Sequence, residues 1–137
     1  MFEAEKDKYL MKHGFGATRL KAVLFDMDGV LFDSMPNHAY SWSHAMTLFG
    51  LHITPEEAYM HEGRTGGGTI DLLAQRDWGR RATEEEKQTI YKAKSDVFSR
   101  CPEAPRMPGA YELLKKVKAD GFIPMVVTGS GQVSLID

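Results

Sequence analysis

The sequence predicts an α/β fold in which parallel strands are joined by helices, with a second group of helices inserted after the first strand. Two continuous apolar runs, near 21–26 and 122–127, each end in small polar residues, as strands buried in a parallel sheet do. A helical pattern at 109–121 precedes the second run, which is the order of a strand–helix–strand unit. Further helical patterns fill 36–106 and are too many for one crossover.

The amino-terminal half is expected to alternate helix and strand. Residues 2–13 predict a short amphipathic helix to which we assign no chemistry. The run from Lys21 to Asp26 predicts a strand that is buried on both faces. Apolar residues at three- and four-residue spacing predict the next helix, with Gly50 as its C-cap: Trp42, Ala45, Met46 and Phe49.

The middle of the chain predicts three more helices. Thr54 is expected as an N-cap, with Pro55 as the first helical residue. GRTGGGT at 63–69 breaks the helical pattern and predicts a loop, after which TIDLLAQRDWG resumes it. TEEE at 83–86 predicts a capping box that opens a helix to about Arg100.

The last part of the chain repeats the pattern of the first strand, an apolar run that ends in small polar residues. CPEAPRMPG predicts a rigid connector, and GAYELLKKVKADG an amphipathic helix that ends at Gly121. Pro124 lacks a backbone donor, so we place it in the first residues of the following strand. Two strands and one helix cannot cover both faces of a parallel sheet, and the chain stops at SLID, where another helix is due. We therefore expect the front part of a larger protein.

Composition and charge argue against several classes of protein. The 137 residues have the length of about one domain, and a net charge of −2 gives no electrostatic reason to expect nucleic acid or an anionic membrane as partner. No apolar run reaches the roughly 18 residues that span a bilayer, and the amino terminus has no apolar core of a signal peptide. The single cysteine, Cys101, excludes an internal disulfide and favours a cytoplasmic location.

Polar residues follow both expected strands, at the end of an α/β sheet where ligands bind. Asp26 and Asp28 follow the first strand, and burying both as unpaired carboxylates would cost several kcal/mol. A divalent cation would compensate, and Mg²⁺ prefers such hard oxygen ligands. One carboxylate could then act as a nucleophile toward a bound phosphate, and the other could shuttle a proton. Thr128-Gly129-Ser130 follows the second strand and suits an anion.

The stretches AVLFDMDGVLFDS and MPGAYELLKKVKADGFIPMVVTGS resemble the haloacid dehalogenase superfamily, in the branch that contains β-phosphoglucomutase and phosphoglycolate phosphatase. The resemblance runs from about Leu20 to Asp137. It implies a Rossmann-like, three-layer α/β/α core with a parallel sheet at 19–33 and 107–137. A helical cap would be inserted at 34–106, and residues 1–18 would be an N-terminal extension.

The resemblance also implies roles for the polar residues. Asp26 would be the phosphate-accepting nucleophile and a Mg²⁺ ligand, and Asp28 would be the general acid/base and a ligand through its backbone carbonyl. Thr128 would hold the transferring phosphoryl group, with Gly129 and Ser130 beside it. The family's downstream lysine and terminal acidic ligands have no counterpart because the chain ends first. The 137-residue chain alone is therefore expected to be inactive.

EAYMHEGRTGGGTI and PMVVTGSGQVSL are similar to bacterial inorganic pyrophosphatases of this superfamily. This similarity implies Mg²⁺-dependent hydrolysis of pyrophosphate through an aspartyl phosphate, with Arg64 on phosphate and Glu62 as a further metal ligand from the cap. A β-phosphoglucomutase or small sugar-phosphate phosphatase is the first alternative, and a non-catalytic fragment or binding module is the second. We expect a monomer that acts on a small phosphorylated substrate or pyrophosphate, with no nucleic-acid or membrane partner.

Other polar and aromatic residues have ordinary interpretations. Asp33 and Ser34 suit a hinge or a helix cap. GRTGGGT lacks the Gly-Lys-Ser/Thr of a P-loop, so its glycines are expected to let the cap backbone approach a small ligand. Trp42 and Trp78 are expected in the core. Four histidines have no zinc-like partners and are expected to be surface or packing residues: His38, His44, His52 and His61.

Overall fold

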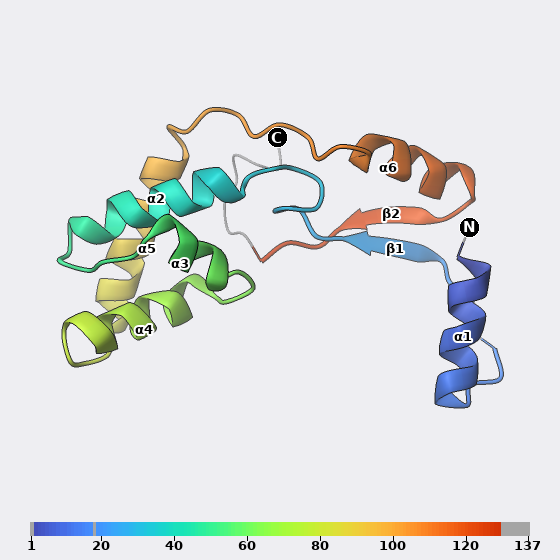
Figure 1. Cartoon of the computed structure of the whole chain (residues 1–137), viewed down its shortest axis with the longest axis horizontal. Coiled ribbons are helices and arrows are strands. Elements are labelled where there is room, and N and C mark those ends of the chain that lie inside the picture. Colours follow the sequence, from blue (N-terminus) through green and yellow to red (C-terminus); the bar gives the residue numbers. More distant parts are fainter. Residues whose placement is uncertain (1, 18, 130–137) are drawn as a thin grey trace.

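The computed structural model describes residues 2–17 and 19–129. Its elements, in chain order, are α1 (Glu3–His13), β1 (Ala22–Phe25), α2 (Met35–Thr47), α3 (Pro55–Met60), α4 (Gly66–Asp77), α5 (Glu84–Phe98), α6 (Ala110–Ala119) and β2 (Ile123–Val126). Figure 1 shows two groups of elements: β1, β2 and α6 lie together, and α2 to α5 form a helical group beyond the carboxyl ends of the strands. The chain therefore has the α/β organisation that its sequence predicts.

The two strands form a parallel pair, as expected. Ala22 lies opposite Ile123, and Phe25 lies opposite Val126. Helix α6 covers one face of this pair through a buried cluster to which β1, the loop after it and α6 contribute: Phe25, Leu31, Ala110 and Val117. Burial of this apolar face is what holds α6 and the strands together.

The other face of the strand pair is open in the part of the chain that the structure describes. Leu24 is 63% exposed, and its partner in β2, Met125, is 50% exposed. The expectation of a first strand buried on both faces is therefore wrong for this chain. The physical reason is that α6 packs against one face only, whereas a parallel sheet is normally covered on both.

The helical group has a core of its own. Helix α2 packs mainly against α3 and α5, and α4 packs against α5. The buried residues of this core come from all four helices and from the loops between them: Ala39, Met46, Leu51, Ile53, Ala58, Ile70, Leu73, Ala74, Ala82 and Ile90. Trp42 and Trp78 are partly buried against it, in agreement with the sequence.

Threonine caps start three of these helices. The Thr54 side chain accepts a hydrogen bond from the backbone N–H of Glu57, and Thr83 forms the predicted capping box with Glu86. Thr65 caps α4 in the same way, so Gly66 to Gly68 form the first helical turn. The prediction that this glycine stretch is a loop is therefore wrong: a threonine cap outweighs the weak helical preference of glycine.

Helix ends agree with the sequence to within a few residues. Helix α5 ends at Phe98, two residues before the predicted Arg100. Helix α2 ends at Thr47 with Leu48 as its C-cap, so Gly50 lies beyond the cap rather than forming it. Gly50 and Gly121 both have a positive φ, which glycine adopts without strain.

The segment that leaves β1 for the helical group runs beside the segment that returns from α5 to α6. The Asp33 N–H donates to the Pro105 carbonyl at 2.8 Å, and the Met107 N–H donates to the Leu31 carbonyl at 2.9 Å. These bonds hold the outgoing and returning segments together at the carboxyl end of β1. No helix in the described ranges is both long and apolar enough to cross a membrane.

Candidate active site

A tight loop follows β1 and positions the two aspartates. The Met27 carbonyl accepts hydrogen bonds from the N–H groups of Leu31 and Phe32, at 2.9 and 3.1 Å. Gly29 has a φ of 71°, and its N–H donates to the Phe32 carbonyl. Met27 is buried, whereas Asp26 is exposed and Asp28 is half-buried. The loop thus anchors its apolar residue and leaves the carboxylates at the end of the strand.

The Asp28 carboxylate is the first member of a polar chain that leads into the helical group. Its Oδ1 accepts a hydrogen bond from Ser34 Oγ at 2.5 Å and lies 3.1 Å from His38 Nε2. The other ring nitrogen, His38 Nδ1, lies 2.8 Å from Lys94 Nζ. An ammonium can only donate, so Nδ1 is the acceptor and Nε2–H donates to Asp28.

These hydrogen-bonded side chains keep the Asp28 carboxylate ionised. Partial burial opposes the carboxylate form, but hydrogen bonds from His38 and Ser34, together with the charge of Lys94, outweigh burial. The net effect is a pKa for Asp28 below its ordinary value. At neutral pH the group is therefore a proton acceptor.

Lys94 is a buried cation and the last member of the polar chain that begins at Asp28. It is only 2% exposed, and its ammonium lies 4.7 Å from the centre of the Phe98 ring and 5.5 Å from that of Trp42. Such aromatic faces attract a cation. Burial lowers the pKa of Lys94 to about 8, against the opposing charges of Asp28 and Glu62.

A cavity of about 310 Å³ lies between the strand ends and the helical group. Both aspartates line it from the strand side, and His38 and Lys94 line it from α2 and α5. The remaining polar residues come from the connector between α3 and α4, the start of α4 and helix α5: His61, Glu62, Arg64, Thr65, Thr69 and Tyr91. Gly129 lines the cavity from the segment after β2.

Glu62 and Arg64 reach the cavity from the connector between α3 and α4 (residues 61–65). Although much of Glu62 is exposed, partial burial at the cavity wall raises the pKa of its carboxyl. The charges of Asp28 and Asp26 raise it further, and the charge of Lys94 lowers it. The charges of the two aspartates therefore act on the Glu62 carboxyl across the cavity.

The donor set suits a hard divalent cation. Within the described ranges no group of three or more His, Cys, Asp or Glu side chains is close enough to hold a metal ion. Mg²⁺ does not need such a cluster, because it is usually bound by one or two carboxylates, waters and substrate phosphate. Asp26, Asp28 and Glu62 line the same cavity, so their carboxylate oxygens are available to such an ion. Asp26 and the backbone of Asp28 would hold the ion, with Glu62 facing it.

The predicted residues at the second strand are only partly placed at the cavity. Gly129 lines it, whereas Thr128, which is half-buried and directly precedes Gly129, is not among the described lining residues. Ser130 lies outside the described residues. Asp26, Asp28, Glu62 and Arg64 do share the cavity, although 34 residues of sequence separate Asp28 from Glu62.

Sequence reasoning missed three residues of the polar chain. Ser34 occupies the N-cap position of α2, as expected, but its hydroxyl bonds to Asp28 instead of capping the helix. The interpretation of His38 as an ordinary surface or packing residue is wrong, because it bonds to both Asp28 and Lys94. A signal for Lys94 was available: it lies four residues after Ile90 and four before Phe98, on the apolar face of α5.

Comparison with known proteins finds a family model and relatives that match most of the chain. A family model described as "Hydrolase: haloacid dehalogenase-like hydrolase" matches residues 20–135. A phosphoglycolate phosphatase of Mannheimia succiniciproducens is 31% identical over 120 residues, which cover 81% of this chain and 52% of that protein. The chain spans about half the length of the curated relatives it matches.

Solved structures show the same fold. The structure described as "Putative beta-phosphoglucomutase from Bacteroides vulgatus" is 56% identical, with a TM-score of 0.87, and the match covers 98% of this chain and 56% of that one. A structure described as a "predicted phosphoglycolate phosphatase" from Haemophilus somnus is 27% identical, with a TM-score of 0.62. That match covers 82% of this chain and 53% of the other.

Proposed function

Because the chain belongs to the haloacid dehalogenase-like hydrolase family, we propose that its cavity serves Mg²⁺-dependent hydrolysis of a small phosphorylated substrate. The observation that carries the proposal is the meeting of Asp26, Asp28 and Glu62 with Arg64 in one cavity. Carboxylates supply a nucleophile and a base, and an arginine supplies an anion contact. The family resemblance assigns the nucleophile to Asp26.

In the first step the Asp26 carboxylate attacks phosphorus. A bond forms between an Asp26 oxygen and phosphorus, and the bond from phosphorus to the leaving-group oxygen breaks. The leaving group departs as an anion or takes its proton from water, because Asp28 is ionised at this stage. Bound Mg²⁺ would neutralise part of the phosphoryl charge, so that one anion can approach another.

In the second step water hydrolyses the aspartyl phosphate. Asp28 takes a proton from the attacking water, the phosphorus–oxygen bond to Asp26 breaks, and inorganic phosphate leaves. The lowered pKa of Asp28 supports this role because it keeps the carboxylate free to accept the proton. Ser34 and His38 orient that carboxylate, and Lys94 holds His38 in the tautomer that donates to it.

We propose inorganic pyrophosphate as the substrate. The reported relatives carry other names, so this choice rests on the resemblance of the connector and on Glu62. A carboxylate at the cavity wall repels a bare phosphate ester but can approach a cation bound to pyrophosphate. A small substrate with two phosphoryl groups suits a polar wall that offers Glu62 and Arg64.

A second candidate is β-phosphoglucomutase activity, or hydrolysis of a small phosphate ester. It is favoured by the 56% identity to the Bacteroides vulgatus protein and by the phosphoglycolate phosphatase relatives. A mutase needs room for its sugar to reorient between two phosphoryl transfers and must keep water away from the phospho-enzyme. A hydrolase needs water admitted at that point.

The test is phosphate release by the full-length protein, which contains at least these 137 residues. Pyrophosphate, phosphoglycolate and β-glucose 1-phosphate are compared with Mg²⁺ present. We expect Glu62→Ala to lower kcat/KM for pyrophosphate at least tenfold, which is about 1.4 kcal/mol of transition-state stabilisation, and to affect the esters much less. Glu56→Ala is the matched control, because Glu56 is exposed on α3 and does not line the cavity.

Three results would overturn the pyrophosphatase assignment. They are efficient isomerisation of β-glucose 1-phosphate, a loss in Glu62→Ala that is equal for all substrates, and phosphate release confined to phosphoglycolate. Absence of activity on all three substrates would favour the binding-module alternative.

A further inference from the structure

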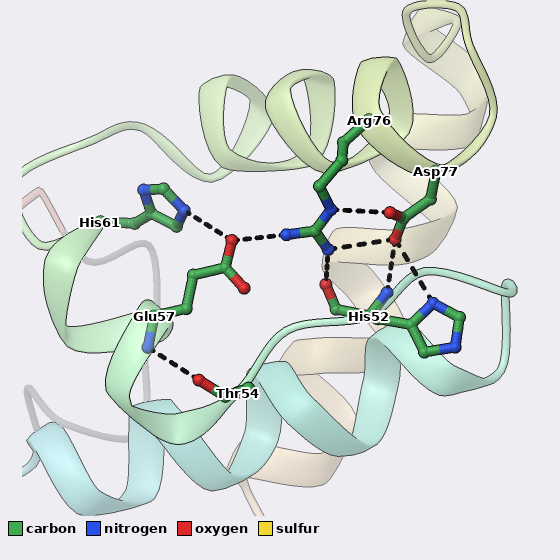
Figure 2. A network of polar contacts seen from close by, with 6 residues as sticks. All are labelled: His52, Thr54, Glu57, His61, Arg76 and Asp77. Carbon is green, nitrogen blue, oxygen red and sulfur yellow. Dashed lines mark hydrogen bonds and ion pairs between the residues drawn. The ribbon is translucent and has the colours of Figure 1, made fainter.

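A polar network on the helical group has no part in the proposed chemistry and is centred on Arg76 of α4 (Figure 2). The Arg76 guanidinium donates from Nη1 to Glu57 Oε1 at 2.6 Å and from Nε to Asp77 Oδ1 at 2.7 Å. Its Nη2 donates to the backbone carbonyl of His52. One planar group therefore contacts α3, α4 and the loop that enters α3.

The network continues on both sides of the guanidinium (Figure 2). Asp77 Oδ2 accepts the backbone N–H of His52 at 2.7 Å, which fixes the loop before α3. On the other side, Glu57 Oε1 lies 3.7 Å from His61 Nε2, an otherwise unbonded nitrogen. His61 is the residue directly before Glu62 and itself lines the cavity.

The packing of the helices explains why such a network matters. Helix α3 rests mainly on α2, whereas α4 rests on α5. The connector 61–65 therefore joins two different helix pairs, and its position depends on how α3 is held relative to α4. The Arg76–Glu57 ion pair ties these two helices directly.

We propose that Arg76 is a positioning residue: it clamps α3 to α4 and so fixes the connector that presents Glu62 and Arg64 to the cavity. This inference rests on the proposed function, because it assigns the clamp to the same site. A planar guanidinium with three partners sets an orientation that a flexible ammonium could not. The test therefore separates the position of the connector from the stability of the fold.

The geometry predicts a small effect on stability. The Arg76 side chain is 41% exposed and that of Glu57 is 27% exposed, and ion pairs at such positions contribute little to folding. We expect Arg76→Met to shift Tm by no more than about 3 °C. The connector should nevertheless open more often, because its two anchoring helices are no longer tied.

The experiment uses the full-length protein and two readouts. Hydrogen exchange of the connector amides is measured without substrate, and kcat/KM for pyrophosphate is measured with Mg²⁺. We expect Arg76→Met to speed exchange at 62–65 about fivefold or more and to lower kcat/KM about fivefold. Arg80→Met is the matched control: it removes an equally close ion pair, with Glu86, at residues that do not line the cavity.

A second experiment, in a protein that already carries Glu62→Gln, links the effect of Arg76→Met on kcat/KM to the cavity. If Arg76 acts by placing Glu62, Arg76→Met should change kcat/KM by less than about twofold in a Glu62→Gln protein. An equal loss in both backgrounds would overturn the proposal, as would connector exchange no faster than in Arg80→Met. Glu57→Gln breaks the same ion pair from α3 and decides the matter if Arg76→Met does not fold.

Failure of the proposed function gives a different result. In that case the unmodified protein would release no phosphate from any substrate, and hydrogen exchange alone would decide whether Arg76 holds the connector. An active protein with unchanged exchange in Arg76→Met would leave the function standing and remove the clamp.

Discussion

Lys94 shows what the site demands of a single residue. A lysine that is 2% exposed loses most of the hydration of its charge, and this loss is the main cause of its lowered pKa. The aromatic rings of Trp42, Tyr91 and Phe98 and the acceptor on His38 compensate only in part. A cation kept at such a position serves the Asp28 carboxylate rather than the stability of α5.

We predict that Lys94→Met increases the free energy of unfolding by about 1–2 kcal/mol at pH 7 and impairs turnover. Between about pH 8 and the ordinary lysine pKa, the unfolded chain holds the Lys94 proton and the folded chain does not. The stability of the unmodified protein therefore rises with pH across this window. The advantage of Lys94→Met should shrink accordingly.

Urea denaturation of the unmodified full-length protein and of Lys94→Met, at pH 7 and pH 10, measures the difference between their free energies of unfolding. An advantage that stays constant with pH, or a variant less stable at pH 7, would show that Lys94 carries no penalty of burial.

For single residues of the site, the sequence predicts the two aspartates better than the side chains that contact them. Asp26 and Asp28 stand out because two charges end an apolar run. Lys94 stands out only as a lysine on the apolar face of α5, and His38 does not stand out, because only folding brings together two residues that are 56 positions apart. A lone histidine and a lone lysine carry no local signal that they will meet.

Among the elements, the start of α4 depends most on one residue type. A Cβ at Gly66 would overlap the ring of Tyr91 on α5, whereas a Cβ at Gly67 would lie 3.7 Å from Lys87 Cδ, an ordinary contact. Gly66 thus lets α4 pack closely on α5, beside the cavity that Gly66 and Tyr91 both line. The sequence predicts that these glycines let the cap backbone approach a small ligand, and the structure adds that Gly66 packs against an aromatic ring.

In the full-length protein we predict that Gly66→Ala lowers the free energy of unfolding by about 1–3 kcal/mol, because the Tyr91 ring, which packs against the core of the helical group, must move. Gly67→Ala is the control and should be neutral or stabilising by up to about 1 kcal/mol, since alanine is the better helix former. Thermal denaturation compares the two. Equal effects would mean that the Tyr91 contact does not decide the residue at 66.

Helices were easier to predict than the glycine turn for a physical reason. Caps such as Thr54 and the Thr83–Glu86 box are local, so the sequence shows them directly. The helical turn at Gly66 depends on the neighbouring α5, which no local pattern reveals.

For the whole molecule, the uncovered face of the strand pair is the main feature. Leu24, Ile123, Met125 and Val127 lie on the face opposite α6, and each is at least 50% exposed. Apolar surface of this kind contributes nothing to folding until something covers it. The parallel pairing followed from the order of elements, whereas the coverage of each face could not be predicted without the neighbours.

We predict that the 137-residue chain, expressed by itself, has no cooperative thermal transition and binds a hydrophobic dye strongly. The exposed sheet face is the reason, because too little apolar area is buried to offset chain entropy. Calorimetry and dye fluorescence measure this. A sharp transition together with phosphate release would contradict it.

In the proposed mechanism Asp26 carries the phosphoryl group during turnover. Acid quenching within milliseconds of mixing with Mg²⁺ and substrate, followed by peptide mass spectrometry, tests it directly in the full-length protein. We predict one phosphoryl group on the peptide that contains Asp26, and neither phosphopeptide nor turnover in Asp26→Asn, whose circular dichroism should be unchanged. Undiminished turnover by Asp26→Asn, or phosphate release with no phosphoryl group on Asp26, would contradict the account.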